Sequence, residues 1–119
     1  MEQEYIKGDI VMYDNRIHTI MDTLGLNNYE LSYIGHPVHQ LELSGVPITP
    51  EILEKNGWKK FKRPYSSDYC YRRKSYPTLN IRSEKEVYFH WGDHDRSIIT
   101  IHQLQHLLFG LGLNSEMEV

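Results

Sequence analysis

Hydrophobic and polar residues alternate with a period of two through the first part of the chain, a pattern typical of half-buried strands. Residues 10–13 form an apolar, β-prone run, and alternating runs cover residues 16–21, 29–34 and 38–43. Turn-forming residues separate the runs at Asp14-Asn15, Asn27-Asn28 and Gly35-His36-Pro37. Four or five short strands within about forty residues favour a small barrel or a curled meander. We therefore predict an SH3-like β subdomain over residues 1–48.

The second part of the chain begins with a clear helix start. Thr49 is suited to the N-cap, Pro50 to the first helical position, and Gly57 to the left-handed residue that ends a short helix. Further strands are predicted at residues 58–62, 69–73, 78–82 and 87–91, followed by a loop over residues 92–95. These elements predict a small antiparallel sheet after the linking helix.

A longer helix is predicted over residues 101–111. Thr100 and Gln103 have the spacing of a capping box. An apolar stripe of Leu104, Leu107, Leu108 and Leu111 should pack on the sheet against Ile81, Val87 and Phe89. We therefore expect an α+β fold with a second subdomain over residues 49–119, the two subdomains sharing one compact unit.

Positive charge is concentrated in one window of the chain. Residues 55–74 contain eight of the thirteen Lys and Arg residues, five aromatic residues and a single acid, Asp68. The window has a net charge of +7, so the other ninety-nine residues carry −10 of the total of −3. Such segregation favours a charged macromolecular partner over a small neutral ligand. We expect the cations to form one exposed stripe after folding.

The expected contact residues of this stripe are Lys59, Lys60, Lys62, Arg63, Tyr65, Tyr69, Arg72, Arg73 and Lys74. The cations could bind phosphates while the rings stack on bases, at about 1–3 kcal/mol per base. They could equally bind an acidic protein surface, or only protect a sheet edge from aggregation. A pI near 6.1 argues against a dedicated nucleic-acid binder. The acidic remainder of the chain could also mimic nucleic acid toward a basic channel.

Two groups of histidines are candidate metal ligands. His90, Asp93 and His94 lie within a short cluster over residues 90–95, and His102 and His106 are four residues apart on the predicted helix. Turn hydrogen bonds and partial burial on the helix explain the same residues without a metal. Cys70, the only cysteine, has no histidine near it in sequence. We expect no metal, no cofactor and no catalytic residue.

The lone cysteine excludes an internal disulfide and favours a reducing compartment. No apolar run approaches the roughly eighteen residues needed to span a membrane, and the acidic start lacks a signal-peptide core. We therefore expect a soluble, cytoplasmic protein without a membrane partner.

Two segments carry a resemblance to a known group. TPEILEKNGW at residues 49–58 and HQLQHLLF at residues 102–109 resemble recurrent segments of small uncharacterised proteins from Bacteroidetes phages and mobile elements. Residues 7–13 are similar to the first strand of the barrel-like start that such proteins often have. The resemblance implies a phage accessory gene acting inside a bacterial host cell, and it implies no catalytic residue. Proteins from that context often disable host defences, as anti-CRISPR proteins do.

We therefore expect a non-catalytic accessory protein that binds and inhibits a host protein or ribonucleoprotein complex, for example an RNA-guided CRISPR nuclease. The first alternative is a module that binds RNA or DNA directly through residues 55–74. The second is a metal-dependent hydrolase.

Overall fold

The computed structural model describes residues 4–62, 69–83, 86–91, 94–98 and 100–119. The chain divides into two compact units, Met1–Val46 and Pro47–Val119. Each unit contains an antiparallel five-stranded sheet, and both α-helices belong to the second unit. The fold is α+β, as the hydrophobic pattern predicted.

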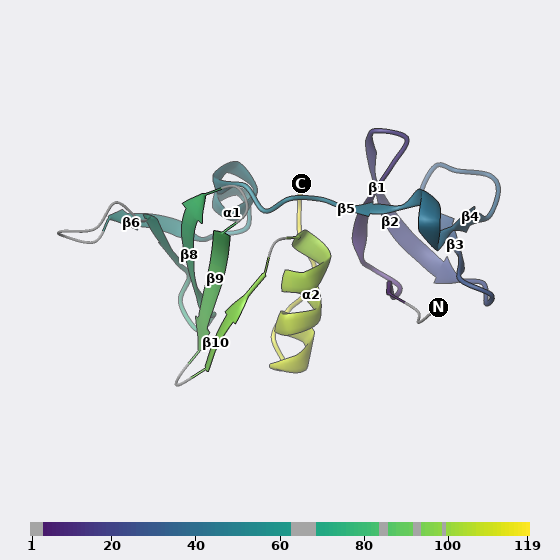
Figure 1. Cartoon of the computed structure of the whole chain (residues 1–119). Coiled ribbons are helices and arrows are strands. Elements are labelled where there is room, and N and C mark those ends of the chain that lie inside the picture. The colour runs from purple at the N-terminus through teal and green to yellow at the C-terminus, as the bar shows by residue number, and fades with distance from the viewer. Residues whose placement is uncertain (1–3, 63–68, 84–85, 92–93, 99) are drawn as a thin grey trace. The chain divides into compact units, whose positions relative to one another are not determined.

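The first unit is a curled meander. Its strands are β1 (Ile10–Tyr13), β2 (Arg16–Thr23), β3 (Asn28–Leu31), β4 (Val38–His39) and β5 (Ser44–Gly45), with the 3-10 helix η1 (Gln40–Glu42) before β5. The strand order is β4-β3-β2-β1-β5, so the last strand returns to pair with the first. Figure 1 shows these strands wrapping into the SH3-like half-barrel that was expected.

Turn residues and alternation set the register of the first hairpin. Tyr13 lies opposite Arg16, which leaves Asp14 and Asn15 as a two-residue turn. Both have positive φ angles, 50° and 61°, as a type I′ turn requires. On β2 the buried side chains are those of His18 and Ile20.

The core of this unit consists of Tyr5, Val11, Ile20, Tyr29, Leu31, Val38 and Leu43. A buried polar group holds it together at one end. The Tyr29 hydroxyl donates to Gln40 Oε1 at 2.6 Å, and the same oxygen accepts the Glu4 N–H at 3.0 Å. The Tyr5 and Tyr29 rings pack edge to face, 5.7 Å apart.

The strand predicted over residues 38–43 is wrong beyond its second residue. His39 Nδ1 accepts the Leu41 N–H at 3.1 Å, and Glu42 Oε2 accepts the His39 N–H at 3.0 Å. These bonds form a capping box that starts η1. Side chains that bond the nearby backbone compete with a sheet ladder, so the alternating pattern was overridden locally.

The second unit contains α1 (Pro50–Lys55), β6 (Lys59–Lys62), β7 (Tyr69–Arg72), β8 (Thr78–Ser83), β9 (Glu86–Trp91), β10 (His94–Ser97) and α2 (Ile101–Gly110). The strand order is β10-β9-β8-β7-β6, a simple meander. The loop predicted over residues 92–95 is wrong at its end, because His94 begins β10 opposite Trp91. The polar sequence of β10 has no apolar alternation, which is why its pattern resembled a loop.

Both helices begin and end as their sequences predicted. The Thr49 hydroxyl accepts the Ile52 N–H at 3.3 Å, and Thr100 with Gln103 forms the capping box of α2. Each helix ends in a Schellman motif, with Gly57 at φ 93° after α1 and Gly112 at φ 73° after α2. Neither described helix has the length and apolar character to cross a membrane.

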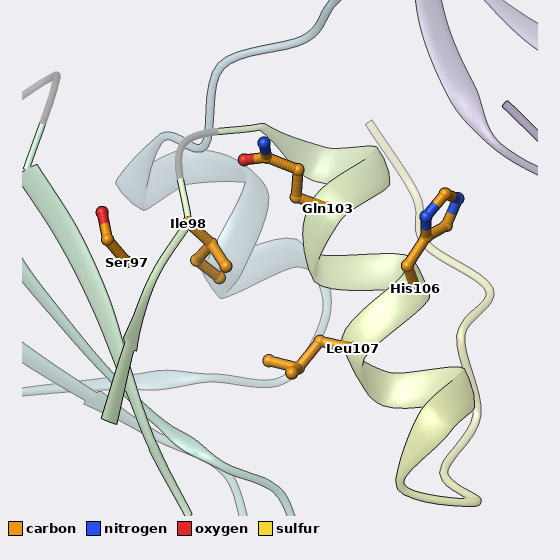
Figure 2. Close-up of a pocket in the computed structure, with 5 residues that line it drawn as sticks. All are labelled: Ser97, Ile98, Gln103, His106 and Leu107. Atoms are coloured by element: carbon orange, nitrogen blue, oxygen red, sulfur yellow. The ribbon is translucent and has the colours of Figure 1, made fainter. Parts of the chain in front are cut away.

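Helix α2 packs beside the sheet, next to the end of β10 (Figures 1 and 2). Its buried side chains are Ile101, His102, Leu104, Gln105 and Leu108. Leu107 and Leu111, also expected in the buried stripe, are only half-buried. Across from the helix, Val87 and Phe89 are buried as expected, and Ile81 is half-buried.

Replacing Gly57 should destabilise the second unit. At φ 93° an alanine is strained, and its Cβ would lie 3.3 Å from Arg73 Nε. We expect Gly57→Ala to lower the free energy of unfolding by about 1–2 kcal/mol in urea denaturation. Gly110→Ala is the control, since this glycine is helical with open space around it and should gain up to about 1 kcal/mol. Equal effects at both sites would contradict the prediction.

The first unit should lose stability at alkaline pH because of Tyr5. Burial raises the pKa of this phenol from 10.0 to about 12, with smaller contributions from nearby acidic groups. The stabilisation is therefore present below pH 10 and is lost as the pH rises toward 12, by at most about 3 kcal/mol. Urea denaturation at about pH 9 and about pH 11 should show this loss in wild type and less of it in Tyr5→Phe. Tyr33→Phe, at a fully exposed ring, should behave like wild type.

Candidate binding surface on the basic hairpin

Strands β6 and β7 form an antiparallel hairpin at one edge of the second sheet. Lys59 lies opposite Arg72, Lys60 opposite Tyr71, Phe61 opposite Cys70, and Lys62 opposite Tyr69. Strand β6 is the edge, whereas β7 pairs on its other side with β8. We call residues 59–62 and 69–74 the basic hairpin.

The two faces of the basic hairpin have different surroundings. Opposite residues share a face, so Lys59, Phe61, Cys70 and Arg72 lie on one side. Lys60 and Tyr69 lie on the other side together with Tyr71, which is buried. On both faces the described cations of β6 and β7 remain exposed. Positive charge is therefore displayed on both sides of the sheet edge.

Four cation–ring contacts hold this charge in place. Lys60 Nζ lies 3.9 Å from the centre of the Tyr69 ring, and the Arg72 guanidinium lies 4.5 Å from that of Phe61. The Arg73 guanidinium lies 3.8 Å from the Tyr76 ring centre and 5.1 Å from that of Trp58. Contacts of this kind contribute about 0.5–1 kcal/mol each at exposed sites. They orient the cations without neutralising them.

No carboxylate of the described residues forms an ion pair with the cations of the basic hairpin whose side chains are described. Lys59 and Arg72, moreover, face each other directly across the two strands. Like charges in that position destabilise a sheet, because their side chains lie close together. The hairpin thus keeps a local repulsion that an acidic residue at either position would remove.

Arg73 differs from the other cations because it is half-buried against Trp58 and Tyr76. Gly57 permits this position, since any Cβ there would press on the arginine side chain. The Trp58 ring is itself buried and donates from Nε1 to Pro77 O at 3.1 Å. Arg73 therefore belongs partly to the core of the second unit.

The remaining sequence-predicted contact residues are placed unequally. Lys74 is exposed in the turn before β8, and Lys62 is the last residue of β6. Arg63 and Tyr65 lie outside the described residues. The structure thus places Lys59, Lys60, Tyr69, Arg72, Arg73 and Lys74 together on or next to one hairpin.

The candidate metal ligands show other partners. His90 Nε2 lies 2.6 Å from Asn80 Nδ2, and His102 Nδ1 lies 3.0 Å from Thr100 Oγ1. The His102 and His106 rings pack edge to face, 5.8 Å apart. Among the described residues, no three His, Cys, Asp or Glu side chains come together as a metal site would need. Asp93 lies outside those residues, and His94 is described only as the first residue of β10.

Cys70 is buried on the same face as Phe61 and Arg72. A thiol with this little access to solvent is placed as a small packing residue rather than as a reactive group.

A cavity of about 310 Å³ lies between the end of β10 and α2. It is lined by Ser97, Ile98, Gln103, His106 and Leu107, and Figure 2 shows Gln103 and Leu107 extending from the helix toward Ile98. The cavity offers a few polar groups around an apolar floor. None of the cations of the basic hairpin lines it.

The first unit has a set of exposed apolar residues that the sequence pattern did not predict. Leu26 is 90% exposed, Tyr33 is 99% exposed and Leu41 is 76% exposed. Leu26 and Tyr33 also have positive φ angles, 50° and 64°. A large side chain in that conformation is strained, and here it gains nothing from burial. The only signal in the sequence was that Leu26 precedes the turn residue Asn27 and that Tyr33 lies two residues before Gly35.

Arg73 should contribute to stability where the other hairpin cations do not. We expect Arg73→Ala to lower the free energy of unfolding by about 1–2 kcal/mol, because it removes contacts with two rings. Lys59→Ala should leave it within about 0.5 kcal/mol of wild type, or raise it, since the repulsion by Arg72 disappears. Chemical denaturation measures both variants. A larger loss in Lys59→Ala than in Arg73→Ala would refute this division of roles.

No family model matches this chain, and neither does any curated protein or solved structure. The resemblance to small phage proteins therefore stays a prediction. The function has to be argued from the residues of the two units themselves.

Proposed function

We propose that this protein is a non-catalytic binding protein that docks through the basic hairpin on an anionic surface of a host macromolecular complex and blocks it. The observation that carries the proposal is the opposed pair Lys59 and Arg72, exposed on neighbouring strands. No described carboxylate neutralises either cation. A partner that supplies negative charge would convert this repulsion into favourable contacts.

Protection of the sheet edge explains only part of the charge. Lysines on an edge strand discourage pairing with another chain, and Lys59 and Lys60 are on the edge strand β6. Arg72 is on β7, which has a neighbour on each side. A cation on an interior strand, opposite another cation, has no role in protecting the edge. This is why we favour a docking role for the basic hairpin.

The first unit supports a partner that includes protein. Leu26 and Tyr33 combine near-complete exposure with a strained backbone. Aromatic and large apolar side chains become favourable when a protein interface covers them. A ribonucleoprotein complex of the host would offer both an anionic and an apolar surface. An RNA-guided CRISPR nuclease is the example that the phage-like segments suggest.

Direct binding of RNA or DNA is the second candidate. Phe61 is 44% exposed on the hairpin, and the Arg72 guanidinium lies over its ring. Aromatic rings flanked by arginine are the usual stacking platform for single-stranded bases. In this case affinity for an oligonucleotide would fall steeply with salt concentration.

Charge reversal on the hairpin tests the proposed function. We expect Lys59→Glu/Arg72→Glu to weaken capture of the partner from host lysate on the order of tenfold or more, because contacts to anionic groups become repulsive. Lys7→Glu/Arg16→Glu is the matched control, since it makes the same change in net charge at two exposed residues of the first unit. Equal capture by both double variants would refute the proposal.

The same variants separate the two candidates. An oligonucleotide titration at several salt concentrations should show weak binding with little difference between the double variants if the partner is a protein surface. Tight, strongly salt-dependent binding that only Lys59→Glu/Arg72→Glu abolishes would establish the direct nucleic-acid binder instead.

A further inference from the structure

The segment after α2 returns along the helix and reaches the end of α1. Figure 1 shows this yellow segment running back beside α2. Gln105 Nε2 donates to Ser115 O at 3.2 Å, which holds the segment against the helix. Three residues further on, the backbone of Glu118 contacts the side chain of Asn56. No local pattern in the sequence brings together these two residues, which are sixty-two positions apart.

Asn56 binds the backbone of Glu118 at both of its polar groups. Asn56 Nδ2 donates to Glu118 O, and Asn56 Oδ1 accepts the Glu118 N–H, each at 2.8 Å. An adjacent strand makes the same pair of bonds to one residue of an extended chain. The carboxamide therefore recognises a peptide backbone whatever the side chain is.

Contacts with helix α1 hold the Asn56 carboxamide in position independently of any bound peptide. Asn56 is the C-cap residue of α1, and its Nδ2 also donates to Ile52 O at 2.7 Å. The following Gly57 takes the left-handed conformation that ends the helix. Because the helix end fixes the orientation of the Asn56 side chain, this side chain loses little conformational freedom when it binds a peptide.

An open cavity of about 500 Å³ surrounds this contact. The end of α1 and the basic hairpin contribute Lys55, Asn56, Gly57 and Arg73, and the segment contributes Asn114, Glu116, Met117 and Glu118. Two cations and two carboxylates thus line one cavity, yet no ion pair joins them among the described residues. The segment thus satisfies both polar groups of the Asn56 side chain. It supplies no carboxylate partner, among the described residues, to the charge of Lys55 or Arg73.

We propose that Asn56, Lys55 and Arg73 form a peptide-binding site for an acidic, extended segment of a partner protein, which the chain's own residues 113–119 occupy as a weak internal ligand. The inference rests on the proposed function, because it names the class of segment through which a partner would dock beside the basic hairpin. Peptide is the ligand that we favour, because a peptide backbone already binds both polar groups of Asn56 in this structure. Thymine also carries an N–H next to a C=O, so nucleic acid is tested below as a competitor. The internal segment competes at the high effective concentration of a tethered ligand.

The test uses the full chain and a fluorescein-labelled peptide of residues 113–119, Leu-Asn-Ser-Glu-Met-Glu-Val, followed by fluorescence anisotropy. Wild type should bind the peptide weakly because its site is already occupied. Glu116→Lys/Glu118→Lys places cations beside Lys55 and Arg73, which should release the internal segment. We expect at least tenfold tighter peptide binding to this variant. Adding Asn56→Ala should remove that gain.

Two further measurements make the outcome decisive. Circular dichroism melting shows whether Asn56→Ala still folds. If it does not, Lys55→Glu in the charge-reversed background should weaken peptide binding by at least tenfold. An unlabelled oligothymidylate of higher charge than the peptide should fail to displace it. Equal peptide affinity of wild type and Glu116→Lys/Glu118→Lys, or displacement by the oligothymidylate, would overturn the peptide site.

The outcomes separate this site from the proposed function. Peptide binding as expected, together with unchanged partner capture by Lys59→Glu/Arg72→Glu, would refute the docking role of the hairpin and leave the peptide site standing. Loss of capture in that variant without any peptide binding would refute the peptide site alone.

Discussion

The buried indole of Trp58 is the contact on which the second unit depends most. Its backbone N–H bonds Leu53 O at 3.0 Å and so ends α1, while its Nε1 bonds Pro77 O at 3.1 Å before β8. Tyr76 packs edge to face on the ring at 5.6 Å, and Arg73 lies over it. One side chain thus ties a helix end, the start of the edge strand and a turn into a single core. The position of Arg73 follows from that arrangement.

The charge of the hairpin and its stability are connected through this contact. Arg73 packs against the core, so its charge is fixed close to Trp58. Lys59 and Lys60 on the edge strand β6, and Arg72 on the neighbouring strand β7, are left exposed. The Tyr69 ring orients Lys60 on one face, and the Phe61 ring orients Arg72 on the other. Neither ring neutralises the positive charge. The same arrangement places Arg73 and Lys55 in the cavity beside Asn56. A stable core and two candidate contact sites therefore share one set of residues.

Local signals in the sequence predicted most of the elements but not all of their limits. Thr49, Gly57 and the Thr100–Gln103 pair act within a few residues, so their effects could be foreseen. The strand expected over residues 38–43 was replaced by η1, because His39 and Glu42 bond the nearby backbone. Strand β10 was missed because its residues are polar and β9 alone supplies its register. Pairing between strands depends on a neighbour that the pattern of one segment does not contain.

The sequence by itself determined the α+β class, the positions of the helix ends and the concentration of cations near residue 60, since composition and short-range bonding suffice for these. The tertiary structure alone placed Lys59 opposite Arg72, put Arg73 against Trp58, and brought Glu118 to Asn56. It also revealed the exposed Leu26 and Tyr33. The physical reason is distance along the chain: strand register, burial and long-range contacts arise from packing among many segments, whereas capping and turn formation arise within one.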